Sequence, residues 1–84
     1  MTVHLLDTGV IELTGACPSE DAETLLQQLL LAPDAQVDWR SCESAHTAVI
    51  QVLLLARPRM LGAAAGPGLR EWVQPLLGGG GGDG

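Results

Sequence analysis

Residues Gln36 to Arg57 read QVDWRSCESAHTAVIQVLLLAR and contain, in order, an alternating segment, a polar segment and a long apolar segment. Apolar and polar side chains alternate in Ala35 to Trp39, and this pattern predicts a short strand. Arg40 to Glu43 is predicted to be a polar connection. Ser44 is then predicted to be the N-cap of a helix that has Thr47 in its first turn.

The predicted helix after Ser44 is apolar on nearly every side, and Gln51 is its main exception. Ile50, Leu54 and Leu55 extend the apolar surface beyond a single stripe. A helix of this composition is either buried on two sides or carries an interaction surface. The pattern is therefore also compatible with self-association of the chain through this helix.

Two short strands are predicted before this segment, at Thr2 to Leu6 and Val10 to Leu13. The sequence Asp7-Thr8-Gly9 between them is a turn signal, so together they predict a hairpin. Thr14 to Ala16 is then expected to lead the chain into a helix.

The first helix is expected to begin at Cys17 or Ser19, because Pro18 suits a first-turn position and acidic residues follow. Glu20, Asp21 and Glu23 are expected to lie on solvated faces. Helical spacing predicts one apolar stripe, formed by Ala22, Leu25, Leu26, Leu29 and Leu30. Pro33 disfavours helical geometry at the residue before it, so the helix should end there.

After the apolar helix, Met60 to Ala65 predicts a weak strand and Leu69 to Leu77 a short helix. The element order is then β-β-α-β-α-β-α, which predicts an α/β fold with a mostly parallel sheet of about four strands and helices packed on it. We expect one domain over residues 1–77. The six glycines of Gly78 to Gly84 predict a flexible tail.

The composition limits the classes of partner. The net charge is −6, with no lysine and four arginines, which argues against nucleic-acid binding and suits a basic protein partner. No signal peptide and no apolar run of about 20 residues is visible, so we expect a cytoplasmic chain without membrane insertion. Cys17 and Cys42 are then expected to be reduced thiols. Trp39 and Trp72 are the only large rings that the core could use.

The element order and one segment resemble the STAS domain, the fold of bacterial anti-sigma-factor antagonists. The segment is Val37-Asp38-Trp39, a short polar turn, and then HTAVIQVLL from His46 to Leu54. Family members carry a strand ending in Asp, a loop of about eight residues, and an Asp-Ser/Thr pair that opens an apolar helix. The distance from Asp38 to Thr47 matches that spacing, and the family's acidic residue before the phosphorylated position is His46 here.

The resemblance implies a regulatory module of bacterial signalling that binds a protein partner, such as an anti-sigma-type serine kinase. It implies that Thr47 is the phosphorylated position. The candidate partner-binding residues are Asp38, Ser44, His46, Thr47, Ile50 and Leu54. No enzymatic activity and no cofactor are implied.

Other interpretations of the same residues are open. Thr47 could simply bond back to a carbonyl or help to cap the helix. The chain could be a scaffold or interaction subunit of a signalling complex, without phosphorylation. His4, His46, Cys17 and Cys42 could form a metal or thiol site, but their spacing is irregular, and we predict neither a catalytic residue nor a metal.

Overall fold

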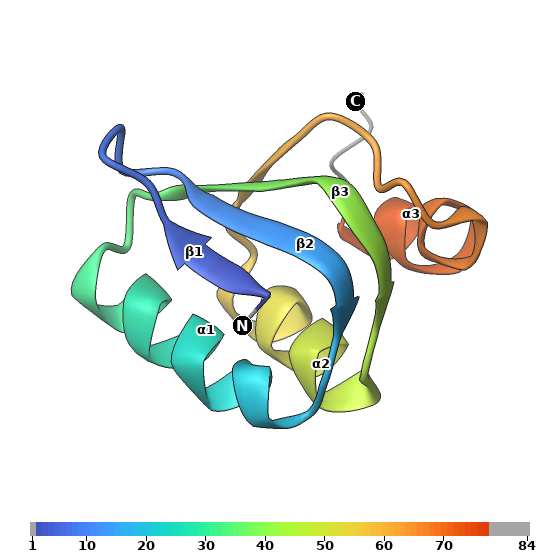
Figure 1. Ribbon diagram of the computed structural model, residues 1–84, viewed down its shortest axis with the longest axis horizontal. Coiled ribbons are helices and arrows are strands. Elements are labelled where there is room, and N and C mark those ends of the chain that lie inside the picture. The colour runs from blue at the N-terminus through green and yellow to red at the C-terminus, as the bar shows by residue number, and fades with distance from the viewer. Residues whose placement is uncertain (1, 78–84) are drawn as a thin grey trace.

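The computed structural model describes residues 2–77, so the predicted glycine-rich tail lies outside the described residues. The elements follow the predicted order, with the last helix in two segments (Figure 1). They are β1 (Val3–Leu5), β2 (Ile11–Cys17), α1 (Glu20–Leu31), β3 (Gln36–Ala45), α2 (Thr47–Ala56), β4 (Arg59–Leu61), η1 (Leu69–Val73) and α3 (Gln74–Leu77).

One sheet contains all four strands in the order β1-β2-β3-β4. β1 is antiparallel to β2, while β2 is parallel to β3 and β3 is parallel to β4. The predicted hairpin is present, and Gly9 in its turn has φ +85°, a conformation that favours glycine. The α/β class and the four strands are therefore confirmed. The expectation of a mostly parallel sheet is corrected to a mixed sheet, because the hairpin reverses β1.

Helices α1 and α2 pack against each other and lie side by side along one face of the sheet (Figure 1). η1 contacts β3, and α3 contacts α2, so the C-terminal segment packs at the β3 side of the molecule. The longest helix has 12 residues, and across residues 2–77 no helix is long and apolar enough to cross a membrane.

Helix α1 buries a narrower stripe than its sequence predicted. Ala22, Leu25 and Leu29 are buried, whereas Leu26 and Leu30 are 39% and 70% exposed. The acidic first turn is also different from the expectation, because Asp21 is only 5% exposed. Its carboxylate accepts hydrogen bonds from the backbone N–H and the hydroxyl of Thr2, just before β1. Asp21 is therefore a structural link between α1 and the start of the chain, and the prediction of a solvated side chain was wrong.

Strands β2 and β3 both continue past the predicted ends, so the polar connection at Arg40 to Glu43 was a wrong prediction. These residues belong to β3, which pairs with β2 as far as Ala45 opposite Cys17. Two register shifts each insert an extra residue into β3. Such bulges interrupt the alternation of sides, so that Trp39 and Cys42 are both buried although they lie three residues apart. The broken alternation is what made this half of the strand resemble a loop.

The C-terminal elements are shorter or less regular than predicted. The strand expected at Met60 to Ala65 covers only Arg59–Leu61. The helix expected at Leu69 to Leu77 is present, but its first part is a π-helix in which Gln74 N–H donates to Leu69 O. Pro75 follows and has no N–H with which to continue the usual hydrogen-bond ladder.

The core is aliphatic with a single aromatic ring. Its fully buried side chains are Trp39, Ile11, Leu13, Leu25, Leu53, Val37, Val49 and Cys42. The indole N–H of Trp39 donates to Gly62 O at 2.9 Å, so its polar atom is satisfied. Trp72, the other ring expected for the core, is 74% exposed.

Candidate functional site

The junction between β3 and α2 brings three of the predicted site residues together. Ser44 is exposed within β3, His46 is the N-cap of α2, and Thr47 is the first residue of the helix. The predicted N-cap at Ser44 is therefore wrong by two residues, because β3 extends through Ala45. The three side chains nevertheless follow one another at the same end of the sheet.

His46 caps α2 with its side chain. The backbone N–H of Ala48 donates to Nδ1 of His46 at 3.0 Å, and the N–H groups of Val49 and Ile50 donate to its carbonyl oxygen. The ring nitrogen that faces Ala48 must be unprotonated to accept this bond. His46 thus performs the capping task that Ser, Thr, Asp and Asn usually perform.

Thr47 is exposed at the positive end of the α2 dipole. Within residues 2–77 its hydroxyl has no hydrogen-bond partner, and the capping bond comes from His46 instead. The plainer interpretation of Thr47 as a capping or back-bonding residue therefore has no support in the geometry. The hydroxyl is available for a contact or a modification.

Asp38 lies far from this junction. It is in the half of β3 that pairs with β4, opposite Leu61, and the eight residues 39–46, of mainly extended chain, separate it from Thr47. Its carboxylate forms a bidentate ion pair with Arg40, with Oδ2–Nη2 at 2.8 Å and Oδ1–Nε at 3.0 Å. The hydrogen bonds from Arg40 lower the pKa of Asp38. Asp38 and Thr47 thus have the expected spacing in sequence but do not form one site.

Ile50 and Leu54 are half-buried in α2, and the most exposed large apolar residue of this helix is Leu55, at 84%. A hollow of about 410 Å³ is lined by Gln51, Leu54 and Leu55. The sequence analysis named Leu54 but not Leu55 as a candidate partner-binding residue, and the structure shows that Leu54 is the less exposed of the two.

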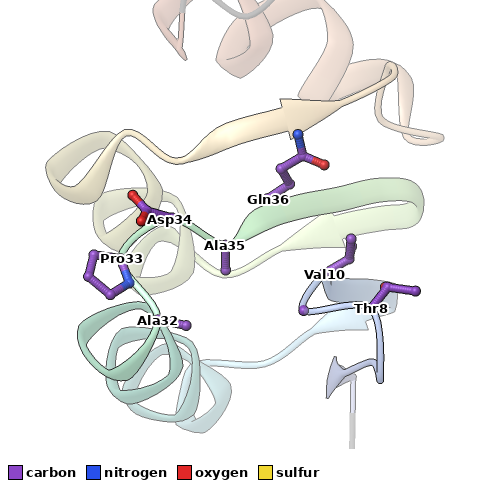
Figure 2. Close-up of a pocket in the computed structure, with 8 residues that line it drawn as sticks. Thr8, Val10, Ala32, Pro33, Asp34, Ala35 and Gln36 are labelled. Atoms are coloured by element: carbon purple, nitrogen blue, oxygen red, sulfur yellow. The ribbon is translucent and has the colours of Figure 1, made fainter.

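A second hollow lies at the opposite end of the sheet from Thr47 and has a volume of about 400 Å³ (Figure 2). It is lined by the β1–β2 turn and the α1–β3 connection, through Thr8, Gly9, Val10, Ala32, Pro33, Asp34, Ala35 and Gln36. Asp34 is its only ionisable side chain, and this composition suggests no acid–base or nucleophilic chemistry.

The two cysteines are neighbours in the core. Cys17 ends β2, Cys42 lies in β3, both are buried, and their Sγ atoms are 3.8 Å apart. The hydrogen bond between them lowers the pKa of Cys17 and raises that of Cys42, and burial raises the Cys42 pKa further. The only signal in the sequence was that both cysteines follow strand-like segments.

The thiol–imidazole and metal alternatives gain no support from the geometry. Cys42 is in a strand and His46 caps a helix, so the two are not on one helical face. His4 is exposed in β1, on the other side of β2. Within residues 2–77 no group of three or more His, Cys, Asp or Glu side chains could hold a metal ion.

No protein-family model, curated protein sequence or solved structure matches this chain.

Proposed function

We propose that this chain is a regulatory protein-binding module of the cytoplasm, resembling the anti-sigma-factor antagonists, and that its partner contacts the β3–α2 junction. The observation that carries the proposal is the position of Thr47. Its free hydroxyl is exposed at the first residue of α2, directly after the His46 cap. The element order and the HTAVIQVLL segment add the resemblance to STAS domains.

We propose that partner binding is regulated by phosphorylation of Thr47 by a serine kinase of the anti-sigma type. A phosphate there would meet the positive end of the α2 dipole, so the helix would tolerate it. It would add about −1.5 to −2 charges at neutral pH to a surface that docks a partner. The chain already carries a net charge of −6, so a partner that is apolar or acidic at the contact would be released.

The test is to incubate the chain with a candidate kinase and ATP and to locate phosphate by mass spectrometry. Trypsin cleaves after Arg40 and Arg59, so Thr47 lies in the fragment 41–59. Fragmentation of this peptide must distinguish Thr47 from Ser41 and Ser44. We expect phosphate on Thr47 alone.

Binding variants complete this test. Thr47→Asp should weaken partner affinity at least about tenfold, equivalent to about 1.4 kcal/mol. Thr8→Asp is the matched control, because Thr8 is exposed at the other end of the sheet and should leave affinity unchanged. If Thr47 stays unmodified and Thr47→Asp binds the partner with unchanged affinity, the proposed regulation by phosphorylation is refuted.

The second candidate function is a scaffold or interaction subunit without phosphorylation. The 84% exposure of Leu55 beside a hollow lined by Gln51 and Leu54 favours it. Leu55→Glu and Leu54→Glu should then abolish partner binding while Thr47→Ala is silent. Because Leu54 is half-buried, Leu55→Glu is the cleaner variant, and Gln27→Glu on the exposed side of α1 is its control.

A further inference from the structure

Cys17 and Cys42 are the only cysteines of the chain, and they are in contact. They lie on adjacent parallel strands, 3% and 1% exposed, with their Sγ atoms 3.8 Å apart. A disulfide bond is about 2.05 Å long, so the two sulfur atoms must approach by slightly less than 2 Å. Each thiol also lies near a backbone carbonyl, Cys17 near Thr14 O and Cys42 near Ser44 O.

The local backbone can supply part of this movement. Cys17 is the last residue of β2 and precedes the exposed Pro18. A register shift between Gly15 and Ala16 leaves Glu43 as the extra residue on β3, next to Cys42. A bulged strand end is bent and has an interrupted ladder, so it adapts more readily than a regular strand.

From this geometry we propose that Cys17 and Cys42 are a modification site at which a hydroperoxide forms a reversible disulfide between β2 and β3. Because the two residues are only 3% and 1% exposed, the proposal requires that a small peroxide reaches them where a bulky thiol reagent does not. The inference does not depend on the proposed partner or on Thr47.

The reaction balances with the peroxide as the two-electron oxidant. The Cys17 thiolate attacks one oxygen of ROOH, the O–O bond breaks, and Cys17 becomes a sulfenic acid while RO⁻ takes up a proton and leaves as ROH. The Cys42 sulfur then attacks the Cys17 sulfur, the S–O bond breaks, and hydroxide leaves as water with the Cys42 proton. The sum is two thiols and ROOH giving one disulfide, ROH and water.

Cys17 is assigned the first step because it ends β2, whereas Cys42 lies within β3. Either thiol can donate the hydrogen bond between the two sulfur atoms, and when Cys17 is the thiolate Cys42 is the donor. That bond stabilises the Cys17 thiolate and lowers its pKa, although burial opposes the effect. Cys42 is the resolving residue, because its sulfur lies next to that of Cys17 and can attack the sulfenic acid. A dithiol reductant reverses the reaction by thiol–disulfide exchange.

Trypsin provides a direct readout. Cleavage after Arg40 separates Cys17, in fragment 1–40, from Cys42, in fragment 41–59. After the full-length chain is treated with hydrogen peroxide and the remaining thiols are blocked, we expect an intact mass lower by two hydrogen atoms. The two fragments should stay joined until dithiothreitol is added. The rate of disulfide formation should be independent of protein concentration.

Single variants separate the two steps. In Cys42→Ser the Cys17 sulfenic acid should persist and be trapped by dimedone once the oxidised chain is unfolded in urea, whereas Cys17→Ser should react with peroxide at least tenfold more slowly. Cys42→Ala and Cys17→Ala replace them if a serine in the core prevents folding. The proposal is overturned if the folded chain keeps both thiols while the urea-unfolded chain loses them. Disulfides formed only between chains, or oxidation only to sulfinic acid, overturn it equally.

Discussion

The backbone N–H of His46 donates to the carbonyl oxygen of Cys17 at 2.9 Å, so the last residue of β2 is bonded to the N-cap of α2. Through this bond the position of the α2 N-terminus depends on the end of β2. The capping side chain, the exposed Thr47 and the buried cysteine pair therefore belong to one end of the sheet.

The His46 cap should contribute measurably to stability. His46→Ala removes the Nδ1 acceptor of the Ala48 N–H and should lower the free energy of unfolding by about 1 kcal/mol. His46→Asp should restore or exceed the wild-type value, because aspartate is a preferred N-cap and its charge suits the helix dipole. Urea denaturation measures both. Equal stability of His46→Ala and wild type would show that the cap does not form in solution.

Asp21 should be the most sensitive acidic residue of α1. Asp21→Ala removes the acceptor of two hydrogen bonds from Thr2 and should cost about 1–3 kcal/mol of unfolding free energy. Glu23→Ala, at an exposed position of the same turn, should change it by less than about 0.5 kcal/mol. In a double-mutant cycle the changes in unfolding free energy caused by Asp21→Ala and Thr2→Ala should not be additive. Strict additivity would argue against this contact.

The two tryptophans should differ in both fluorescence and stability. Trp72→Phe leaves only the buried Trp39, so its emission should be blue-shifted and weakly quenched by acrylamide. Trp39→Phe leaves only the exposed Trp72 and should give red-shifted, strongly quenched emission. Trp39→Ala should cost about 3–5 kcal/mol, whereas Trp72→Ala should be nearly neutral. Stronger acrylamide quenching of Trp39 than of Trp72 would contradict the observed packing.

Gly66 and Gly68 form a matched pair two residues apart. A Cβ at Gly66 would overlap the carbonyl group of Glu43, while a Cβ at Gly68 meets nothing within 4 Å. Gly66→Ala should therefore destabilise the chain by about 1–3 kcal/mol, as an overpacked site does. Gly68 has helical angles, so Gly68→Ala should be neutral or stabilising by up to about 1 kcal/mol. Thermal unfolding of the two variants decides the matter.

Asp38 should contribute a small pH-dependent stability. Its folded-state pKa is lowered by Arg40, so the contribution is present above the unfolded pKa, about 3.9, and is lost as pH falls through the folded pKa. Asp38→Asn should flatten the acid end of the stability curve below about pH 4, relative to Asp34→Asn. The difference should be small and decrease with salt, because the pair is on the surface.

The sequence was most informative where a single local signal agreed with the tertiary environment. The turn at Gly9, the inward residues Ala22, Leu25 and Leu29, and the helix after Thr47 were all predictable from periodicity and turn chemistry. Periodicity also predicted that Trp72 lies on the apolar side of its helix. Leu69 and Val73 of the same helix are buried whereas Trp72 is exposed, and the period of 3.6 residues does not apply to the π-helical turn that contains all three.

Other features depend on contacts between distant residues. The bulges in β3 exist only in register with β2, so the paired half from Ser41 to Ala45 has no local signature. The burial of Asp21 depends on Thr2, nineteen residues earlier in the chain. The contact between Cys17 and Cys42 likewise follows from the pairing of two strands and not from spacing in the sequence.

The short length of β4 leaves the second half of β3 without a neighbouring strand on that side. β4 pairs with β3 only as far as Asp38, and beyond it the N–H of Gly66 donates to Cys42 O at 3.0 Å. The segment around Gly66 therefore covers an edge that would otherwise offer unpaired backbone groups to another strand. Detachment of this segment, during folding or after damage, would expose the unpaired backbone groups of β3 to edge-to-edge pairing with another strand.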